Sequence, residues 1–257
     1  MDWLKLLRQL ADRTDKIALD FFRRVDLRVE YKKDNSPVTA ADKNIEEYIR
    51  TVAARRVKSL RFYGEEFGHE EADLRLFIDP IDGTRNFVRG VPIFATLLAI
   101  EERGEIIAGL VSAPAINTRW WAARDAGAFV AEKNTGRRRQ IAVSKVADLS
   151  KAQLFHSSLS GNEIRAKAKK QILRLIDATE RQRGYGDFYQ HVLTAQGSGE
   201  AALDPDARPY DLAPLKIIIE EAGGIFTSFQ GRKTIFDGNA VSSNGLVQGE
   251  ILKILRA

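Results

Sequence analysis

Two successive patterns of apolar residues constrain the fold of this chain most strongly. Between residues 74 and 131, short apolar runs are separated by turn residues, with Gly104 in one turn and Asp125-Ala126-Gly127 in another. Short runs joined by tight turns predict antiparallel hairpins. After residue 150, apolar runs alternate with helical segments, which is typical of an α/β layer. We therefore expect an antiparallel sheet in the first half and an α/β arrangement in the second.

The spacing of apolar residues predicts the individual elements. One helix starts near Trp3, and a second follows a polar loop at residues 32–37 and a capping box, Thr39-Ala40-Ala41-Asp42. The helix at residues 163–178 is expected to bury Ile172, Leu173 and Ile176 on one face. Further predictions are strands at residues 74–78, 96–100, 106–111, 120–123, 128–131, 141–143, 154–157 and 225–227, and helices at 188–196, 212–222 and 245–256.

Length and composition place the chain among ordinary globular proteins. At 257 residues with 44% hydrophobic residues, it can bury a substantial core without cross-links. No flexible linker separates the halves, so we expect one compact unit over residues 1–257, with a soft division into 1–140 and 141–257. The chain contains no cysteine, which excludes disulfides, thiolate metal sites and a cysteine nucleophile.

Charge and hydropathy exclude several classes of partner. The net charge of +5 is dispersed, and no aromatic residues interleave the densest basic run, Arg137-Arg138-Arg139, so a nucleic-acid partner is not expected. No apolar run approaches the roughly 20 residues that a membrane helix needs. The N-terminal segment is amphipathic and lacks the pattern of a signal peptide. These features indicate a soluble cytoplasmic protein with no membrane partner.

The segment from Phe77 to Phe87 holds the most informative acidic residues. Asp79 and Asp82 follow an apolar run, with Gly83 and Thr84 directly behind them. Hard divalent cations such as Mg²⁺ bind carboxylate oxygens, and a glycine lets a phosphate approach the backbone amides. Asp, Pro and Gly also favour simple turns, so a turn is the alternative. Two residues separate the aspartates, which argues against the spacing used for aspartyl-phosphate intermediates.

Other acidic residues have both a functional and a structural interpretation. Glu65 lies in Gly64-Glu65-Glu66 after an apolar run, where it can be a ligand and a base or simply be solvated. Asp211, after Tyr210, opens a helix that stops at Gly223-Gly224, and an N-cap role would explain it equally well. Asp42 likewise completes the capping box at Thr39.

Together these motifs resemble the inositol-monophosphatase-like superfamily over nearly the whole chain. The resemblance implies an α/β (α+β) fold, an alternating five-layer αβαβα sandwich of the inositol-monophosphatase and sugar-phosphatase type, in a homodimer. It implies Mg²⁺-dependent hydrolysis of a phosphate monoester by in-line attack of a metal-activated water, with two or three ions per site. The implied metal ligands are Glu65, Asp79, the Ile81 carbonyl, Asp82 and Asp211.

The resemblance also implies further roles. Glu65 and Thr84 would orient and deprotonate the attacking water, and Asp42 would serve catalysis near a weaker metal. The amides of Gly83 and Thr84 would bind the phosphate. The family usually has tryptophan where this chain has Tyr210, which affects the neighbouring wall and not the ligand.

The segment Gly186-Asp187-Phe188-Tyr189 bears on the substrate. It resembles the histidinol-phosphate phosphatases of the same superfamily, whereas inositol phosphatases typically carry small hydroxyl residues here. A carboxylate at Asp187 suits a cationic substrate, and Phe188 or Tyr189 can pack on an imidazole ring. Asp204 matches a position whose acid contacts the substrate. The alternative is that Asp187 only caps a helix.

Several functions follow from these predictions. The leading one is a histidinol-phosphate phosphatase of histidine synthesis, acting on a small phosphorylated metabolite. The second is an inositol-1-phosphate or broad-specificity sugar-phosphate phosphatase. A third, from another class, is a non-catalytic metal- or RNA-binding regulatory protein. Among the histidines, a structural role is favoured for His191, an exposed position for His69, and His156 has no assigned role.

Overall fold

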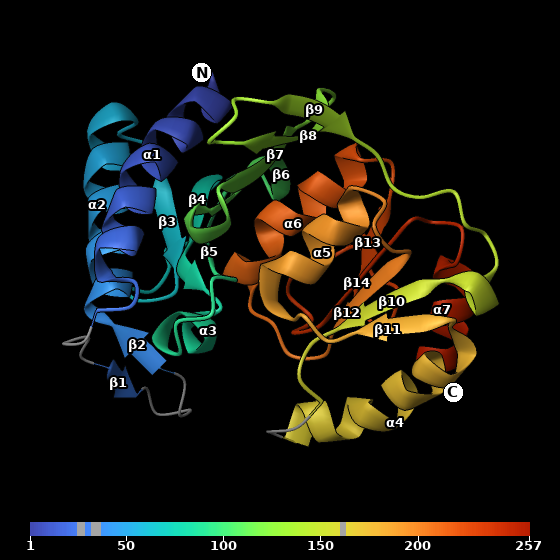
Figure 1. The fold of residues 1–257 in the computed structure, drawn as a ribbon. Coiled ribbons are helices and arrows are strands. Elements are labelled where there is room, and N and C mark those ends of the chain that lie inside the picture. The colour runs from blue at the N-terminus through green and yellow to red at the C-terminus, as the bar shows by residue number, and fades with distance from the viewer. Residues whose placement is uncertain (25–28, 32–36, 160–162) are drawn as a thin grey trace.

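The chain folds into five alternating layers of helices and sheets (Figure 1). The computed structural model describes residues 1–24, 29–31, 37–159 and 163–257, and the side chains of these residues except 163–167. Helices α1 (Trp3–Phe21) and α2 (Ala40–Arg56) form the first layer, and α5 (Asp187–Ala195) and α6 (Pro209–Glu221) form the third. Helices α4 (Glu163–Ala178) and α7 (Gln248–Arg256) form the fifth. The predicted five-layer sandwich is thereby confirmed.

The second layer is a seven-stranded sheet in which the strands follow one another in chain order. Only β3 and β4 pair in parallel, so the predicted antiparallel hairpins are confirmed. The last strand covers residues 138–141 and not 141–143, which corrects that prediction. The strands are β3 (Arg61–Gly64), β4 (Leu74–Asp82), β5 (Ala95–Glu102), β6 (Glu105–Ala113), β7 (Thr118–Ala123), β8 (Gly127–Glu132) and β9 (Arg138–Ile141).

The fourth layer is a five-stranded sheet with the order β11-β10-β12-β14-β13. Strands β12 and β14 lie inside this sheet, but the sequence analysis did not predict them. Each has only four residues, and their sequences are Ala-Ala-Leu-Asp and Ala-Val-Ser-Ser. Strand β10 runs parallel to both β11 and β12. The strands are β10 (Gln153–His156), β11 (Arg181–Arg183), β12 (Ala201–Asp204), β13 (Ile225–Thr227) and β14 (Ala240–Ser243).

The remaining elements are short. Strands β1 (Val29–Tyr31) and β2 (Pro37–Thr39) form a two-stranded sheet, and α3 (Thr84–Val88) follows β4. Single 3₁₀ turns occur at Pro114–Ile116 and Leu149–Lys151. Most of the polar loop expected at residues 32–37 lies outside the described residues. No helix in the described part of the chain is long and apolar enough to span a membrane.

Two helix predictions need correction. On α4, Ile172 and Leu175 are fully buried, whereas Leu173 is 43% exposed. Leu173 follows Ile172 directly and therefore lies about 100° around the helix from it, away from the buried face. Helix α7 begins at Gln248 and not at residue 245, because Gly245 adopts a left-handed turn.

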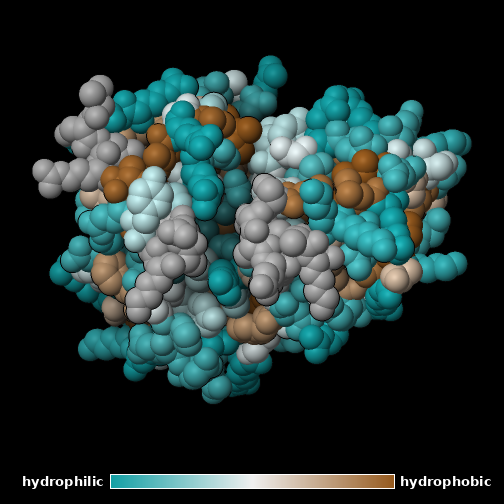
Figure 2. Space-filling model, turned by 90° about the horizontal axis from the view of Figure 1, so that it is seen from below, coloured by the Kyte–Doolittle hydropathy of each residue, from teal (hydrophilic) through white to brown (hydrophobic). Residues whose placement is uncertain are grey.

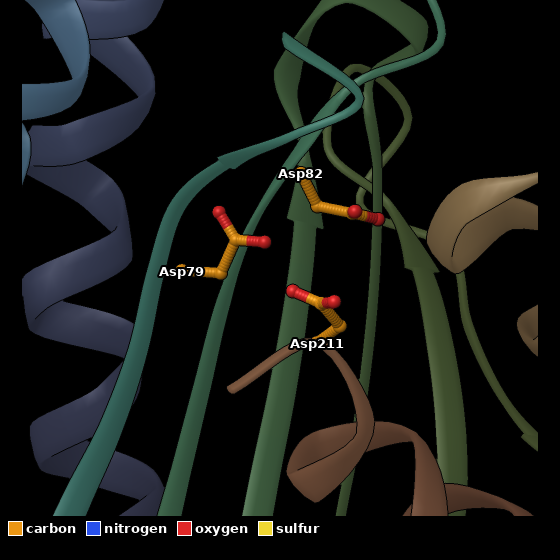
Figure 3. A group of neighbouring side chains, drawn as sticks. All are labelled: Asp79, Asp82 and Asp211. Carbon is orange, nitrogen blue, oxygen red and sulfur yellow. The ribbon is translucent and has the colours of Figure 1, made fainter. Parts of the chain in front are cut away.

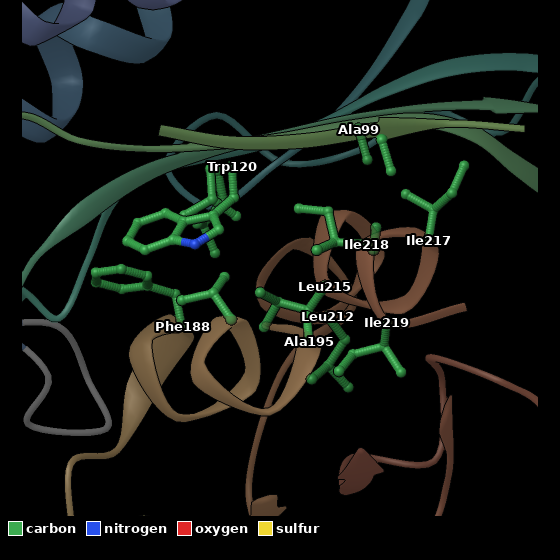
Figure 4. Packing of buried hydrophobic residues seen from close by; sticks show 14 of the residues in the cluster. Ala99, Trp120, Phe188, Ala195, Leu212, Leu215, Ile217, Ile218 and Ile219 are labelled. Carbon is green, nitrogen blue, oxygen red and sulfur yellow. The ribbon is translucent and has the colours of Figure 1, made fainter. Parts of the chain in front are cut away.

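Helix α6 is buried between the two sheets and packs on both sides. Figure 4 shows its apolar residues facing the seven-stranded sheet on one side and α5 on the other. On the sheet side, α6 approaches β6 closely at Gly109. A Cβ atom at Gly109 would lie 2.6 Å from the Ile217 Cγ2 atom and 2.9 Å from the Pro214 Cα atom. This contact determines how deeply α6 is seated.

We expect Gly109→Ala to destabilise the protein by about 1–3 kcal/mol, because the backbone of Pro214 cannot move aside as a flexible side chain would. A change of this size lowers the melting temperature by roughly 2–4 °C per kcal/mol in a chain of this length. Thermal unfolding measures the effect. Gly249→Ala is the matched control, since nothing lies within 4 Å of a Cβ atom there. Equal stability of the two variants would contradict the packing argument.

Candidate metal-dependent active site

Three aspartates from two distant segments converge at one place. Asp79 and Asp82 lie at the end of β4, and Asp211 lies in the first turn of α6. One oxygen of each carboxylate lies within 4.8 Å of the others, and Figure 3 shows the three carboxyl groups facing a common space. Such a group of oxygen donors can hold a metal ion.

An irregularity in β4 brings Asp79 and Asp82 to the same side. Residues three apart on a regular strand point to opposite faces of the sheet. Here Asp79 pairs with Leu97 and Asp82 with Ala95, so three steps along β4 match two steps along β5. The extra residue is a β-bulge, which turns the second carboxylate back toward the first.

Side-chain hydroxyls hold the carbonyl groups of this bulge. The Thr96 hydroxyl donates to the Pro80 carbonyl at 2.9 Å, and the Thr84 hydroxyl donates to the Ile81 carbonyl at 2.8 Å. Gly83 then takes a left-handed conformation, with φ of 82°, where the strand turns into α3. The predicted residues Ile81, Gly83 and Thr84 therefore share one hydrogen-bonded turn.

Backbone amides orient two of the three aspartates. The Arg208 N–H donates to Asp211 Oδ2 at 2.7 Å, so Asp211 is the third helical residue of a capping box whose N-cap is Arg208, and not the N-cap that the sequence suggested. The Phe188 N–H donates to Asp82 Oδ2 at 2.5 Å. Within the described part of the chain, the buried Asp79 Oδ1 atom has no hydrogen-bond partner. A buried acceptor of this kind is costly unless a ligand satisfies it.

Burial and the close approach of the acidic side chains raise their pKa values. Burial raises the pKa of Asp79 well above its usual range, and Glu65, Asp82 and Asp211 add to the effect. Burial also raises the pKa of Asp82, with contributions from Asp187 and Asp211. For Asp211, burial raises the pKa to about 7 against the opposing hydrogen bond from Arg208. A cation among these groups would reverse the trend, because it favours the charged carboxylates.

Glu65 and Asp42 lie beside this cluster and not within it. Glu65 follows β3, where its N–H donates to the Ile78 carbonyl at 3.2 Å, and it is not in the group within 4.8 Å. Asp42 is buried, and Thr39 donates to its Oδ2 atom from the backbone at 2.8 Å and from the hydroxyl at 2.6 Å. The capping box is thus confirmed. Burial raises the pKa of Asp42 to about 7, and the charges of Glu65 and Glu66 contribute.

A pocket of about 650 Å³ joins this cluster to the second half of the chain. Figure 2 shows the corresponding face hollowed near its centre, with hydrophilic residues in the hollow. Most predicted site residues line the pocket: Glu65, Asp82, Gly83, Thr84, Asp187, Phe188, Asp204 and Asp211. It also contains residues that the sequence did not indicate, namely Arg85, Asn86, His156, Ser157, Lys169 and Tyr185.

Asp187 lies close to the turn at Gly83. A Cβ atom at Gly83 would be 3.3 Å from Asp187 Oδ2, and the Asn86 side-chain amide donates to the same oxygen at 3.3 Å. Asp187 adopts φ of 51°, which is unusual outside glycine and often marks a functional site. Asp204 ends β12, lines the same pocket and accepts from the Ser157 hydroxyl at 3.3 Å.

The position of Phe188 corrects the idea that its ring packs on a substrate. The side chain is fully buried, and its ring centroid lies 6.2 Å from that of Trp120 (Figure 4). Its contribution to the site is the N–H that binds Asp82. Tyr185 is 40% exposed and lines the pocket, so it is the aromatic residue that a substrate can reach.

The histidines have different environments. His191 is fully buried, and its Nδ1 atom lies 2.7 Å from the Ser242 hydroxyl, so its environment is that of a structural residue. Burial lowers its pKa to about 3. His69 is exposed, as expected, and stacks on Tyr63. His156 borders the pocket, which its position at a strand end could have suggested.

Comparisons with known proteins agree with this site. Residues 2–257 match the model of the Inositol monophosphatase family. Histidinol-phosphatases of Mycobacterium tuberculosis and Streptomyces coelicolor are each 43% identical to the chain, covering 100% and 99% of it and 98% and 97% of their own lengths. The structure of the Thermotoga maritima IMPase superposes with a TM-score of 0.88 at 31% identity, covering 100% of this chain and 97% of that one. The chain therefore belongs to the inositol monophosphatase family and is a phosphoric monoester hydrolase.

Proposed function

We propose that the protein is a Mg²⁺-dependent histidinol-phosphate phosphatase. The observation that carries this proposal is one pocket that brings a metal-binding cluster together with two further carboxylates. Asp79, Asp82 and Asp211 form the cluster suited to metal ions. Asp187 and Asp204 line the same pocket and would present carboxylates to the alcohol part of a substrate. The names of the two histidinol-phosphatase relatives support the same substrate.

The residues present fit divalent metal ions. The buried and unpartnered Asp79 Oδ1 atom needs a ligand, and all donors nearby are hard oxygens, which Mg²⁺ prefers over softer ligands. Asp79, Asp82, Asp211, Glu65 and the Ile81 carbonyl would hold two or three ions. Bound Mg²⁺ would supply Lewis acidity at the phosphate and lower the pKa of the attacking water.

The chain's own residues then position the reactants. The Thr84 hydroxyl donates its proton to the Ile81 carbonyl, so its oxygen lone pairs can accept a hydrogen bond from water. Glu65, which lines the same pocket as Thr84, would accept the proton that the attacking water loses. The amides of Gly83 and Thr84 bind the phosphate oxygens, since Gly83 has no side chain to block their approach.

Asp187 and Asp204 would select the alcohol part of the substrate. Histidinol phosphate carries a primary ammonium group and an imidazole ring, whereas inositol phosphate carries only neutral hydroxyls. Hydrogen bonds between charged partners contribute about 1.5–3 kcal/mol each, roughly twice as much as neutral ones. Asp187 and Asp204 therefore favour the cationic substrate, and Tyr185 borders the same space. The cytoplasmic location and the homodimer stay predictions.

We expect Asp187→Asn to lower kcat/KM for histidinol phosphate by roughly 10- to 100-fold, because one charge-assisted hydrogen bond is lost. Activity on inositol-1-phosphate should change by much less. Asparagine tolerates the left-handed backbone of Asp187 and can still accept from Asn86, so the fold should be retained. Phosphate release with Mg²⁺ on both substrates measures the ratio. An equal loss on both would remove Asp187 as the specificity residue.

The raised pKa values predict how the metal-free protein responds to pH. Asp211 titrates near 3.8 when unfolded and at about 7 when folded, so the folded state binds more protons between these values. Its contribution to folding is therefore retained below about pH 4 and is lost as pH rises toward about 7. With EDTA, the melting temperature should fall over this range, and Mg²⁺ should restore it at pH 7.5.

Asp79→Asn should reduce both effects, since it removes one buried charge from the cluster. The variant should melt at a higher temperature than the wild type in EDTA at pH 7.5, and should gain less from Mg²⁺. Differential scanning fluorimetry with and without Mg²⁺ tests this. A lower melting temperature in EDTA together with an unchanged Mg²⁺ response would argue that Asp79 is structural.

A further inference from the structure

Helix α2 carries a second buried acid whose role the mechanism above does not use. Glu46 lies one turn after Asp42, and its residue exposure is 0%. A fully buried glutamate is uncommon and needs several partners to offset its desolvation. The partners of Glu46 are on the loop that follows β3 and carries Glu65.

The Glu46 carboxylate binds this loop through two backbone amides. The Glu66 N–H donates to Glu46 Oε2 at 2.8 Å, and the Phe67 N–H donates to Oε1 at 3.3 Å. Arg50, one turn further along α2, donates to Glu46 Oε1 from Nε at 2.8 Å and to the Gly68 carbonyl from Nη2 at 2.5 Å. The pair thus holds both N–H groups and a carbonyl of one short loop.

The same carboxylate explains the glycine that precedes Glu65. A Cβ atom at Gly64 would lie 1.9 Å from Glu46 Oε1 and 2.5 Å from Cδ. The φ of Gly64 is not in the left-handed region, so the residue is not needed for its conformational freedom. Glycine is needed at this position because any larger residue would collide with the Glu46 carboxylate. Glycine lets the buried carboxylate reach the loop.

These contacts leave Glu65 fixed from both sides. On the N-terminal side, the backbone N–H of Glu65 donates to the Ile78 carbonyl on β4. On the C-terminal side, the backbone amides of Glu66 and Phe67 donate to the Glu46 carboxylate. We propose that Glu46, oriented by Arg50, is a positioning residue that aims the Glu65 side chain into the pocket. The role assigned to Glu65 rests on the proposed function, whereas the contact between Glu46 and Gly64 does not.

A double-mutant cycle tests the contact without any assay of activity. Gly64→Ala should lower the melting temperature strongly in the wild-type background, because its methyl group collides with Glu46. In the Glu46→Ala background the same change should have a much smaller effect, since the nearest collision partner is gone and only the flexible end of Arg50, 2.8 Å from the Cβ position, remains. Thermal unfolding of the four proteins measures the coupling. Additive shifts would overturn the assignment of Gly64 as the site that admits Glu46.

Kinetics test the positioning role. Glu46→Gln removes the charge but keeps the size, and misplacement of a catalytic group by about 1 Å can reduce the rate by up to about 100-fold. We expect kcat to fall at least tenfold with a nearly unchanged KM, and the Mg²⁺ concentration for half-maximal activity to rise. Glu47→Gln, on the exposed face of the same helix, is the matched control and should retain wild-type values.

Arg50→Met provides a second variant, in which Glu46 loses its charged partner but keeps the hydrogen bonds from the Glu66 and Phe67 amides. It should change kcat and the Mg²⁺ requirement in the same direction, by a smaller factor. Folded Glu46→Gln and Arg50→Met proteins with wild-type kcat and Mg²⁺ dependence would overturn the positioning role. If the wild-type protein released no phosphate from histidinol phosphate, the proposed function would fail instead, and the Gly64–Glu46 coupling would still be measurable. If Glu65→Gln kept full activity, the role assigned to Glu65 would fail, and the positioning role of Glu46 with it.

Discussion

Mutual repulsion among buried carboxylates is the constraint on which the rest of the structure depends. Asp79, Asp82 and Asp211 lie within 4.8 Å of one another, and burial raises the pKa of each. An arrangement of this kind opposes folding unless a cation offsets the charge. The surrounding fold therefore has to hold the three side chains firmly, which it does with a bulge, an N-terminal helical turn and several backbone amides.

Helix α6 connects the two sheets and also brings in the third aspartate. Its apolar faces pack against the seven-stranded sheet and against α5, and its close approach at Gly109 sets its depth. Because Asp211 lies at its N-terminus, the packing of the core determines the geometry of the charged cluster. The first turn of α5 is joined to the same cluster through the Phe188 amide. The packing of the core therefore also fixes the geometry of the site.

Much of the fold and of the site was predictable from local patterns. Hairpins, the capping box at Thr39 and the aspartates at the end of β4 depend on residues close together in the chain, so their signals are local. Strands β12 and β14 were not predictable, since four residues carry little periodicity and become strands only by pairing with neighbours. The same applies to Leu173, whose exposure depends on how α4 is rotated against its sheet.

The sequence by itself determined the class of the protein. An acidic segment with Gly83 and Thr84, a Gly-Glu-Glu motif and a distant Tyr-Asp pair were enough to indicate a metal-dependent phosphatase. Only the tertiary structure decided which side chains reach the pocket. It buried the Phe188 ring, brought Tyr185 and His156 to the rim, and placed the Glu46 carboxylate where Gly64 leaves room. The reason is physical: contacts between residues far apart in the chain depend on the packing of whole layers, and no short motif records them.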